Sequence, residues 1–122
     1  MFSKLILVVS KLILVVLVII IAAVLYLRFS AVRVSGGDAR ALVAKGATLL
    51  DVRSPEEFGG GHIDGAINIP IQELSGRVDE LDDKNHQIVV YCQSGGRSAM
   101  AKRLLERDGF TSVHDLGGIA QW

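Results

Sequence analysis

The chain has 122 residues, half of them hydrophobic, with 13 basic side chains, 13 acidic side chains and one cysteine, a length that accommodates one domain and little more. Four basic residues and no acidic ones fall in the first 33 positions, so the remainder carries nine basic residues against 13 acidic ones. A mildly acidic domain without a basic stripe excludes nucleic acid as a partner, and a single cysteine excludes an internal disulfide or a Cys-x-x-Cys metal site.

Residues 1–33 contain an aliphatic stretch, Leu5–Leu27, that is interrupted only by Ser10 and Lys11. A helix needs about 20 apolar residues to cross a bilayer. We therefore expect one transmembrane helix here, which anchors the protein to a membrane through residues 5–27.

A cleaved secretory signal is the alternative for this segment. The basic start fits a signal, but the apolar stretch is longer than a usual signal core, and Phe29-Ser30-Ala31 places an aromatic ring where cleavage needs a small residue. An uncleaved single-pass anchor is favoured. The basic residues on its two flanks nearly balance, but the short N-terminal tail and its basic start resemble a signal anchor, which sends the domain across the membrane. We therefore place the domain on the external side, periplasmic in a bacterium, with the cytoplasmic side as a close alternative.

From about Val34 onwards, short apolar runs alternate with helix-type stretches. In chain order we expect a weak strand at Val32–Val34, a helix at Asp38–Lys45, a strand at Thr48–Val52, a short helix from Ser54 to Gly59, a strand at Ala66–Ile69, a helix at Ile71–Leu81, a strand at Gln87–Tyr91, a helix at Ser98–Asp108 and a strand at Thr111–Leu116. This alternation is typical of an α/β domain with a small, mainly parallel sheet flanked by helices.

The cysteine lies where a buried strand ends. Cys92 is followed by Gln93-Ser94-Gly95-Gly96-Arg97 and then by a predicted helix, and ligands of parallel α/β sheets bind beyond the carboxyl ends of strands. Two glycines allow successive N–H groups to point inward as an anion cradle, which favours a thiolate. Arg97 adds a cation suited to an oxyanion.

The segment Cys92–Ser98 resembles the active-site loop of the rhodanese family of sulfurtransferases. The resemblance extends to three further groups of residues: Leu50-Asp51-Val52-Arg53 with Glu56, Glu57 and Phe58; Gly61-His62-Ile63 with Gly65–Pro70; and Gly117-Gly118 with Trp122. It covers about Val34 to Trp122, so we expect residues 34–122 to form a rhodanese-like domain after the anchor of residues 1–33.

The resemblance implies a sulfur-transfer mechanism that needs no cofactor and no metal. The Cys92 thiolate takes a sulfur atom from a small anionic donor such as thiosulfate, and a thiol or cyanide acceptor then removes it from the persulfide. Arg97 would orient the donor. The cradle would be formed by Gln93, Ser94, Gly95, Gly96 and Ser98. Asp51 and Arg53 would support the loops, and His62 would make a packing or backbone contact.

Two rival functions stay open. Related phosphatases separate the cysteine and the arginine by five residues, whereas four residues lie between Cys92 and Arg97. The tighter loop favours sulfur over a phosphoryl group and disfavours a phosphatase or arsenate reductase. A binding module or persulfide relay would keep the same intact loop, and the sequence leaves this reading, the physiological donor and acceptor, and the oligomeric state undecided.

Overall fold

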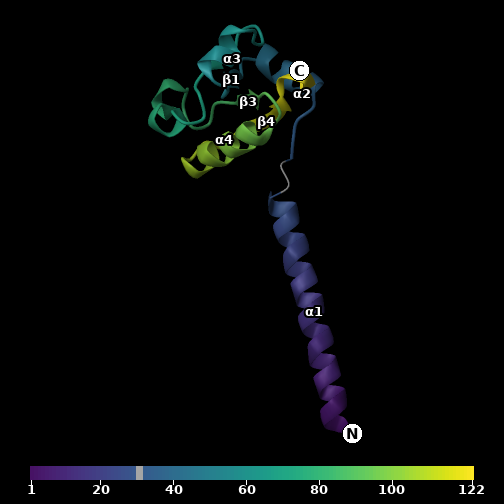
Figure 1. Cartoon of the computed structure of the whole chain (residues 1–122). Helices are drawn as coiled ribbons and strands as arrows, with labels where there is room; N and C mark the ends of the chain where they lie inside the picture. The colour runs from purple at the N-terminus through teal and green to yellow at the C-terminus, as the bar shows by residue number, and fades with distance from the viewer. Residues whose placement is uncertain (30–31) are drawn as a thin grey trace. The chain divides into compact units, whose positions relative to one another are not determined.

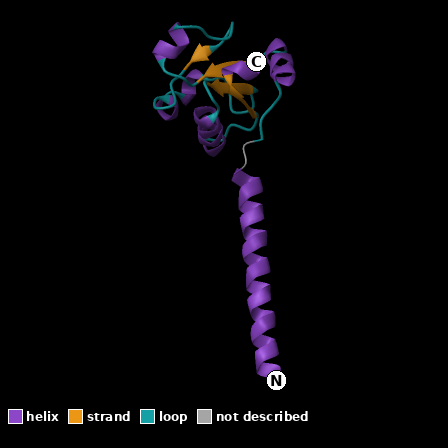
Figure 2. Ribbon diagram, turned by 45° about the vertical axis from the view of Figure 1, so that its right-hand side comes forward, coloured by secondary structure: helices purple, strands orange, loops and turns teal. Residues whose placement is uncertain are grey.

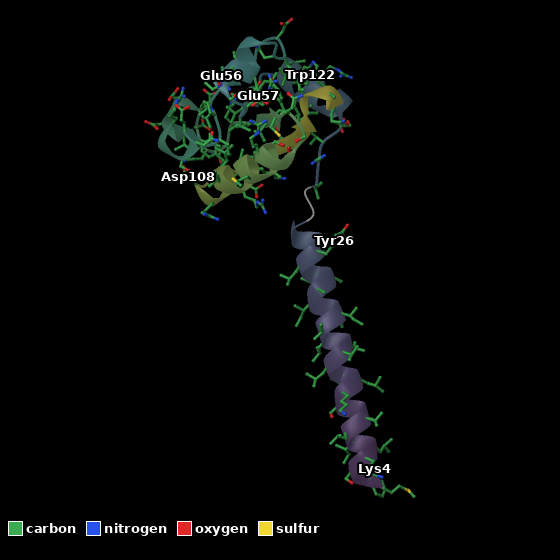
Figure 3. The ribbon with its side chains drawn as sticks, viewed as in Figure 1. Lys4, Tyr26, Glu56, Glu57, Asp108 and Trp122 are labelled. Atoms are coloured by element: carbon green, nitrogen blue, oxygen red, sulfur yellow. The ribbon has the colours of Figure 1, made fainter. Side chains whose placement is uncertain are left out.

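The structure is a computed structural model that describes residues 1–29 and 32–122. It forms two units, an N-terminal helix and a domain from Val32 to Trp122 (Figure 1). Helix α1 spans Phe2–Phe29. Its section Phe2–Tyr26 carries apolar side chains on all sides (Figure 3) and has a mean hydropathy of 3.3 with no part buried.

By length and composition α1 can cross a membrane, although a signal sequence has the same features. Ser10 Oγ donates to the Leu7 carbonyl at 3.0 Å, so this polar side chain is satisfied within the helix, as a lipid environment requires. The last two residues of the candidate cleavage tripeptide Phe29-Ser30-Ala31 lie outside the described residues.

The domain is built on four parallel strands in the spatial order β2-β1-β3-β4, and Figure 2 shows the strands in orange with helices around them. The strands are β1 Thr48–Asp51, β2 Ile67–Asn68, β3 Ile88–Cys92 and β4 Val113–Gly118, and the helices are α2 Gly36–Ala44, α3 Pro55–Gly59 and α4 Gly96–Arg107. Three 3-10 turns complete the described elements: Leu74–Gly76, Val78–Glu80 and Ile119–Gln121. The predicted α/β class with a small parallel sheet is confirmed.

Strand β3 is central, and all five of its residues are buried. Successive side chains of a strand point to opposite faces, so Val90 packs with Leu105 of α4 on one face. Val89 packs with Ala39 of α2 on the other face. Helices on both faces explain why this strand reads as a continuous apolar run.

The predicted helix Ile71–Leu81 is wrong. The segment contains two 3-10 turns instead, although Leu74 and Leu81 are buried as the apolar spacing requires. Residues three apart share a face in a 3-10 turn as they do in an α-helix, and Gly76 weakens an α-helical backbone. The apolar pattern therefore identified the buried side chains but not the backbone conformation.

Several element boundaries also differ from the prediction, including those of all four strands by one or two residues. Helix α2 begins at Gly36 because Ser35 Oγ accepts the N–H of Asp38 at 3.1 Å and caps it. The weak strand Val32–Val34 is reduced to a single bridge between Arg33 and Asp115. Helix α4 begins at Gly96, two residues earlier than expected, which places the end of the cysteine loop within its first turn.

Candidate active site

The loop after β3 closes on the sulfur of Cys92. Cys92 is the last residue of β3 and is 1% exposed, and its Sγ accepts the N–H of Gly95 at 2.9 Å. Gly95 has a φ of +108°, a left-handed conformation that a residue with a side chain rarely adopts. The chain turns back here, and the Gly95 carbonyl accepts the N–H of Ala99 at 3.2 Å to begin α4.

The environment of Cys92 favours its charged form. Burial acts to raise the pKa of the thiol, but the hydroxyl and N–H of Ser98 and the N–H groups of Gly95 and Ser94 outweigh burial, so the pKa is lowered below its usual value. These donors stabilise a negative charge on sulfur, and the N-terminus of α4 adds positive potential at the same point. The structure therefore places Ser94, Gly95 and Ser98 around the sulfur, and their role as a thiolate cradle stays a prediction.

Arg97 is paired with Glu57 from α3 (Glu57 is labelled in Figure 3). Arg97 Nη1 donates to Glu57 Oε1 at 2.7 Å, and Nη2 donates to Oε2 at 3.0 Å. The Arg97 guanidinium, together with the N–H of Ser54, lowers the pKa of Glu57 to about 2. Two of the five N–H donors of Arg97 are thus already used, and its positive charge is offset by the carboxylate of Glu57.

Glu57 is a residue that the sequence analysis did not assign to the site. It also accepts the N–H of Ser54 at 3.1 Å while Ser54 Oγ accepts the N–H of Glu57 at 3.2 Å, a reciprocal capping box. The Ser54-Pro55-Glu56-Glu57 sequence predicts the helix start. It carries no signal for a contact with Arg97, which is 40 positions away.

Asp51 and Arg53 form a buried ion pair next to the loop. Asp51 is fully buried and Arg53 is 3% exposed, and Arg53 Nη2 lies 2.7 Å from Asp51 Oδ2. Arg53 also donates to Gln93 Oε1 at 3.1 Å and to the Gly61 carbonyl at 2.8 Å. The Gln93 side chain therefore joins the cysteine loop to the end of β1, and its hydrogen bond to Arg53 holds the two segments together.

The end of β4 lies against the cysteine loop. The β3–β4 register shifts between Val90 and Tyr91, and after the shift Gly118 pairs with Cys92. A Cβ built on Gly118 would lie 2.7 Å from the Gln93 carbonyl oxygen, so only glycine permits this approach. Ser98 Oγ lies 3.1 Å from the Gly95 carbonyl and 3.4 Å from the Gly117 carbonyl, between the loop and β4. Its single proton is donated to one of these oxygens or to the Cys92 sulfur, not to all three at once.

The remaining predicted residues have simpler surroundings. Gly96 begins α4, and a Cβ built on it would meet nothing within 4 Å. His62 stacks on Phe58 with ring centroids 3.7 Å apart, and its Nδ1 lies 2.9 Å from the Phe58 carbonyl, which is the local contact expected of it. Within residues 1–29 and 32–122, no group of three or more His, Cys, Asp or Glu side chains could hold a metal ion.

Comparisons with known proteins add three relatives. The family described as "Rhodanese-like domain" matches residues 35–122. "Thiosulfate sulfurtransferase PspE" of Escherichia coli is 42% identical over 71 residues, which cover 57% of this chain and 68% of that protein. "Thiosulfate sulfurtransferase 16, chloroplastic" of Arabidopsis thaliana is 42% identical over 93 residues, 66% of this chain and 78% of that protein. The solved structure of the human single-domain sulfurtransferase TSTD1 superimposes with a TM-score of 0.64 at 33% identity, over 73% of this chain and 91% of that one.

Proposed function

Because the chain belongs to the rhodanese-like domain family, in which its relatives transfer sulfur, we propose that it is a sulfurtransferase with Cys92 as the sulfur-carrying residue. The donor is thiosulfate or a similar small anion, and the acceptor is a thiol or cyanide. The proposal rests on the hydrogen bond that Cys92 Sγ accepts from the Gly95 N–H at 2.9 Å, in a loop that lowers the pKa of the thiol. The direct test is the intact mass of the full-length chain after treatment with thiosulfate.

The reaction divides into two displacements at sulfur. The Cys92 thiolate attacks the outer sulfur of thiosulfate, a Cys–S bond to that sulfur forms, and sulfite leaves with the electron pair of the broken bond. The acceptor thiolate or cyanide then attacks the terminal sulfur and returns Cys92 to the thiolate. Loop N–H groups that stabilise the thiolate equally stabilise the negative terminal sulfur of the persulfide.

In this proposal the other predicted residues support the loop. Gln93, Ser94, Gly95, Gly96 and Ser98 form the cradle, and Asp51 and Arg53 hold Gln93. Arg97 orients the donor anion, and Glu57 sets how readily Arg97 is released to do so. The last role follows from the two hydrogen bonds between Glu57 and Arg97.

The pair gives a prediction about donor binding. Arg97→Ala should raise the KM for thiosulfate about tenfold, and Arg97→Lys should recover only part of the loss, because an ammonium cannot make the planar two-point contact. Glu57→Gln can still cap α3 but no longer neutralises Arg97, so its KM should fall below the wild-type value. Steady-state assays with thiosulfate and cyanide measure both effects, with thermal unfolding as the control for folding. An unchanged KM in folded Arg97→Ala would assign the arginine a purely structural role.

The pairing of Arg97 with Glu57 also favours a second candidate function, a persulfide relay. A protein-bound persulfide donor would not depend on Arg97 to attract a small anion, whereas thiosulfate would, and the charge of Arg97 is offset by Glu57. Rapid steady-state turnover with thiosulfate and cyanide supports the enzyme. A Cys92 persulfide that forms stoichiometrically but turns over poorly supports the relay.

For the whole chain we propose a membrane-attached protein, with residues 1–33 as a single-pass anchor and linker and residues 34–122 as the catalytic domain. The apolar helix α1 supports this division. We propose the external side for the domain, with the cytoplasmic side as the alternative.

Topology can be tested with introduced cysteines. Cys92 is 1% exposed and is a poor target for bulky reagents, whereas Met100 on α4 is 50% exposed. In a Cys92→Ser background, Met100→Cys should react with a membrane-impermeant maleimide in intact cells or spheroplasts, and Ser3→Cys at the other end of α1 should react only after lysis. The reverse pattern would place the domain in the cytoplasm. Recovery of the full-length chain in the soluble fraction would contradict the anchor itself.

A further inference from the structure

The segment just before the matched family region reaches the active-site loop. Arg33 pairs with Asp115 through a parallel β-bridge, and the following N–H, that of Val34, donates to the Asp115 carbonyl at 2.9 Å. These contacts fix the backbone of Arg33 at the edge of β4. The match to the family begins at residue 35, so it does not include this arginine.

The Arg33 side chain lies along two glycines of the site. A Cβ built on Gly117 would lie 3.0 Å from Arg33 Cδ and 3.2 Å from Cζ, and one built on Gly95 would lie 2.8 Å from Cζ and closer still to Nη2. The guanidinium therefore rests on Gly95, whose N–H donates to Cys92 Sγ. Neither glycine could carry a side chain without displacing Arg33.

Ser98 holds the same two glycines from the buried side. Its hydroxyl lies 3.1 Å from the Gly95 carbonyl and 3.4 Å from the Gly117 carbonyl, and Ser98 is fully buried. Arg33 is exposed and contacts Gly95 and Gly117 through their Cα positions. The junction between the cysteine loop and β4 is thus held by a hydroxyl within the fold and by a cation at the surface.

The cation is close enough to act on the sulfur. The contacts from Cys92 Sγ through Gly95 to Arg33 Cζ limit their separation to about 9 Å, which is within the Debye length of about 10 Å at 0.1 M salt. No hydrogen bond or ion pair joins Arg33 to another described side chain, whereas Arg97 is bonded at both terminal nitrogens to Glu57. Arg33 therefore contributes a positive charge beside the loop that is not used in a hydrogen bond to Glu57, and the nearest acidic residue along its own strand pairing is the buried Asp115.

We propose that Arg33 is a positioning residue of the Cys92 site: it holds Gly95 with its N–H on the sulfur and supplies a cation that stabilises the thiolate and attracts the anionic donor. The effect on the donor rests on the proposed sulfurtransferase function. The effect on the thiolate does not, because it concerns only Arg33, Gly95 and Cys92. The N-terminal end of the domain, which begins at Val32, is thus part of the active site.

The test uses the full-length chain in detergent and measures the rate of Cys92 alkylation by iodoacetamide, a neutral reagent, against pH. Arg33→Gln should move the midpoint upward by about half a unit to one unit, because a thiolate-stabilising charge is lost. Arg33→Lys should restore most of the wild-type midpoint, and the shift should shrink at 1 M salt, where the Debye length is about 3 Å. The KM for thiosulfate should rise severalfold in Arg33→Gln with a smaller change in kcat.

Arg40→Gln is the matched control. Arg40 is an exposed arginine on α2 whose guanidinium lies 6.0 Å from the Trp122 ring, and its loss should leave both the alkylation midpoint and the KM for thiosulfate unchanged.

An unchanged midpoint and KM in Arg33→Gln, in a chain that still gains sulfur from thiosulfate, would overturn this inference and leave the proposed function standing. An equal shift of the alkylation midpoint in Arg33→Lys and Arg33→Gln would show that the positive charge of Arg33 does not stabilise the thiolate. A wild-type chain that takes up no sulfur would instead refute the proposed function, and the alkylation profile would still decide the effect of Arg33 on the thiolate.

Discussion

The full-length chain treated with thiosulfate is expected to gain the mass of one sulfur atom, and cyanide or a thiol should remove it. Cys92 is the only cysteine in the sequence, and its loop lowers the pKa of the thiol and stabilises negative charge on sulfur. Cys92→Ser should therefore gain no mass and should transfer sulfur at less than about one-thousandth of the wild-type rate, because a hydroxyl cannot form the persulfide.

Met100→Ser is the matched control for this experiment. It also replaces a sulfur-containing side chain by serine, but Met100 is half exposed on α4 and lies eight positions beyond Cys92. It should retain wild-type transfer and the mass gain. Transfer that persists in Cys92→Ser would contradict the mechanism.

Asp51→Ala is expected to lower the free energy of unfolding by about 3–5 kcal/mol, which is typical when one partner of a buried ion pair is removed. Asp51 is fully buried, and Arg53 is 3% exposed and donates to it through Nε and Nη2. The variant leaves a buried guanidinium without its counter-charge and loosens the hydrogen bond that Arg53 makes to Gln93. Urea unfolding of the full-length chain in detergent measures the loss, and sulfur transfer should fall with it.

An exposed pair provides the control. Arg77 Nε lies 2.6 Å from Glu80 Oε2, but the two side chains are 34% and 52% exposed. Glu80→Ala should change stability little, since water solvates both charges in the unpaired state. Equal losses in Asp51→Ala and Glu80→Ala would show that burial does not decide the contribution of the Asp51–Arg53 pair.

The sequence allowed the fold, and the position of the cysteine loop that forms the candidate site, to be predicted because both are encoded by neighbours in the chain. The apolar run Ile88–Tyr91 predicts a buried strand, and the two glycines after Cys92 predict a tight loop. The position of the Cys92 sulfur at the end of the strand therefore follows from residues that are neighbours in the sequence. Element order and the parallel sheet follow from the alternation of such runs. The backbone of Ile71–Leu81 could not be predicted this way, since its apolar spacing fits both an α-helix and 3-10 turns.

The partners of the site residues could not be predicted, because they come from distant parts of the chain. Glu57 meets Arg97 across 40 positions, and Arg33 meets Gly95 only because a bridge to Asp115 holds it at the sheet edge. The sequence allowed Gly117 and Gly118 to be recognised as a motif. It did not show why glycine is needed there. Gly118 lies against the cysteine loop and Gly117 lies against Arg33, and these contacts depend on packing between distant parts of the chain.

The pairing of Glu57 with Arg97 determines how the contact between α3 and the cysteine loop responds to low pH. The folded-state pKa of Glu57 is about 2, below its usual 4.5, so its stabilising effect is fully present above pH 4.5 and is lost only as the pH falls toward 2. A domain exposed to a mildly acidic medium would therefore keep α3 and the cysteine loop joined. Within that range the decline of alkylation with falling pH would report the protonation of Cys92 rather than the loss of this ion pair.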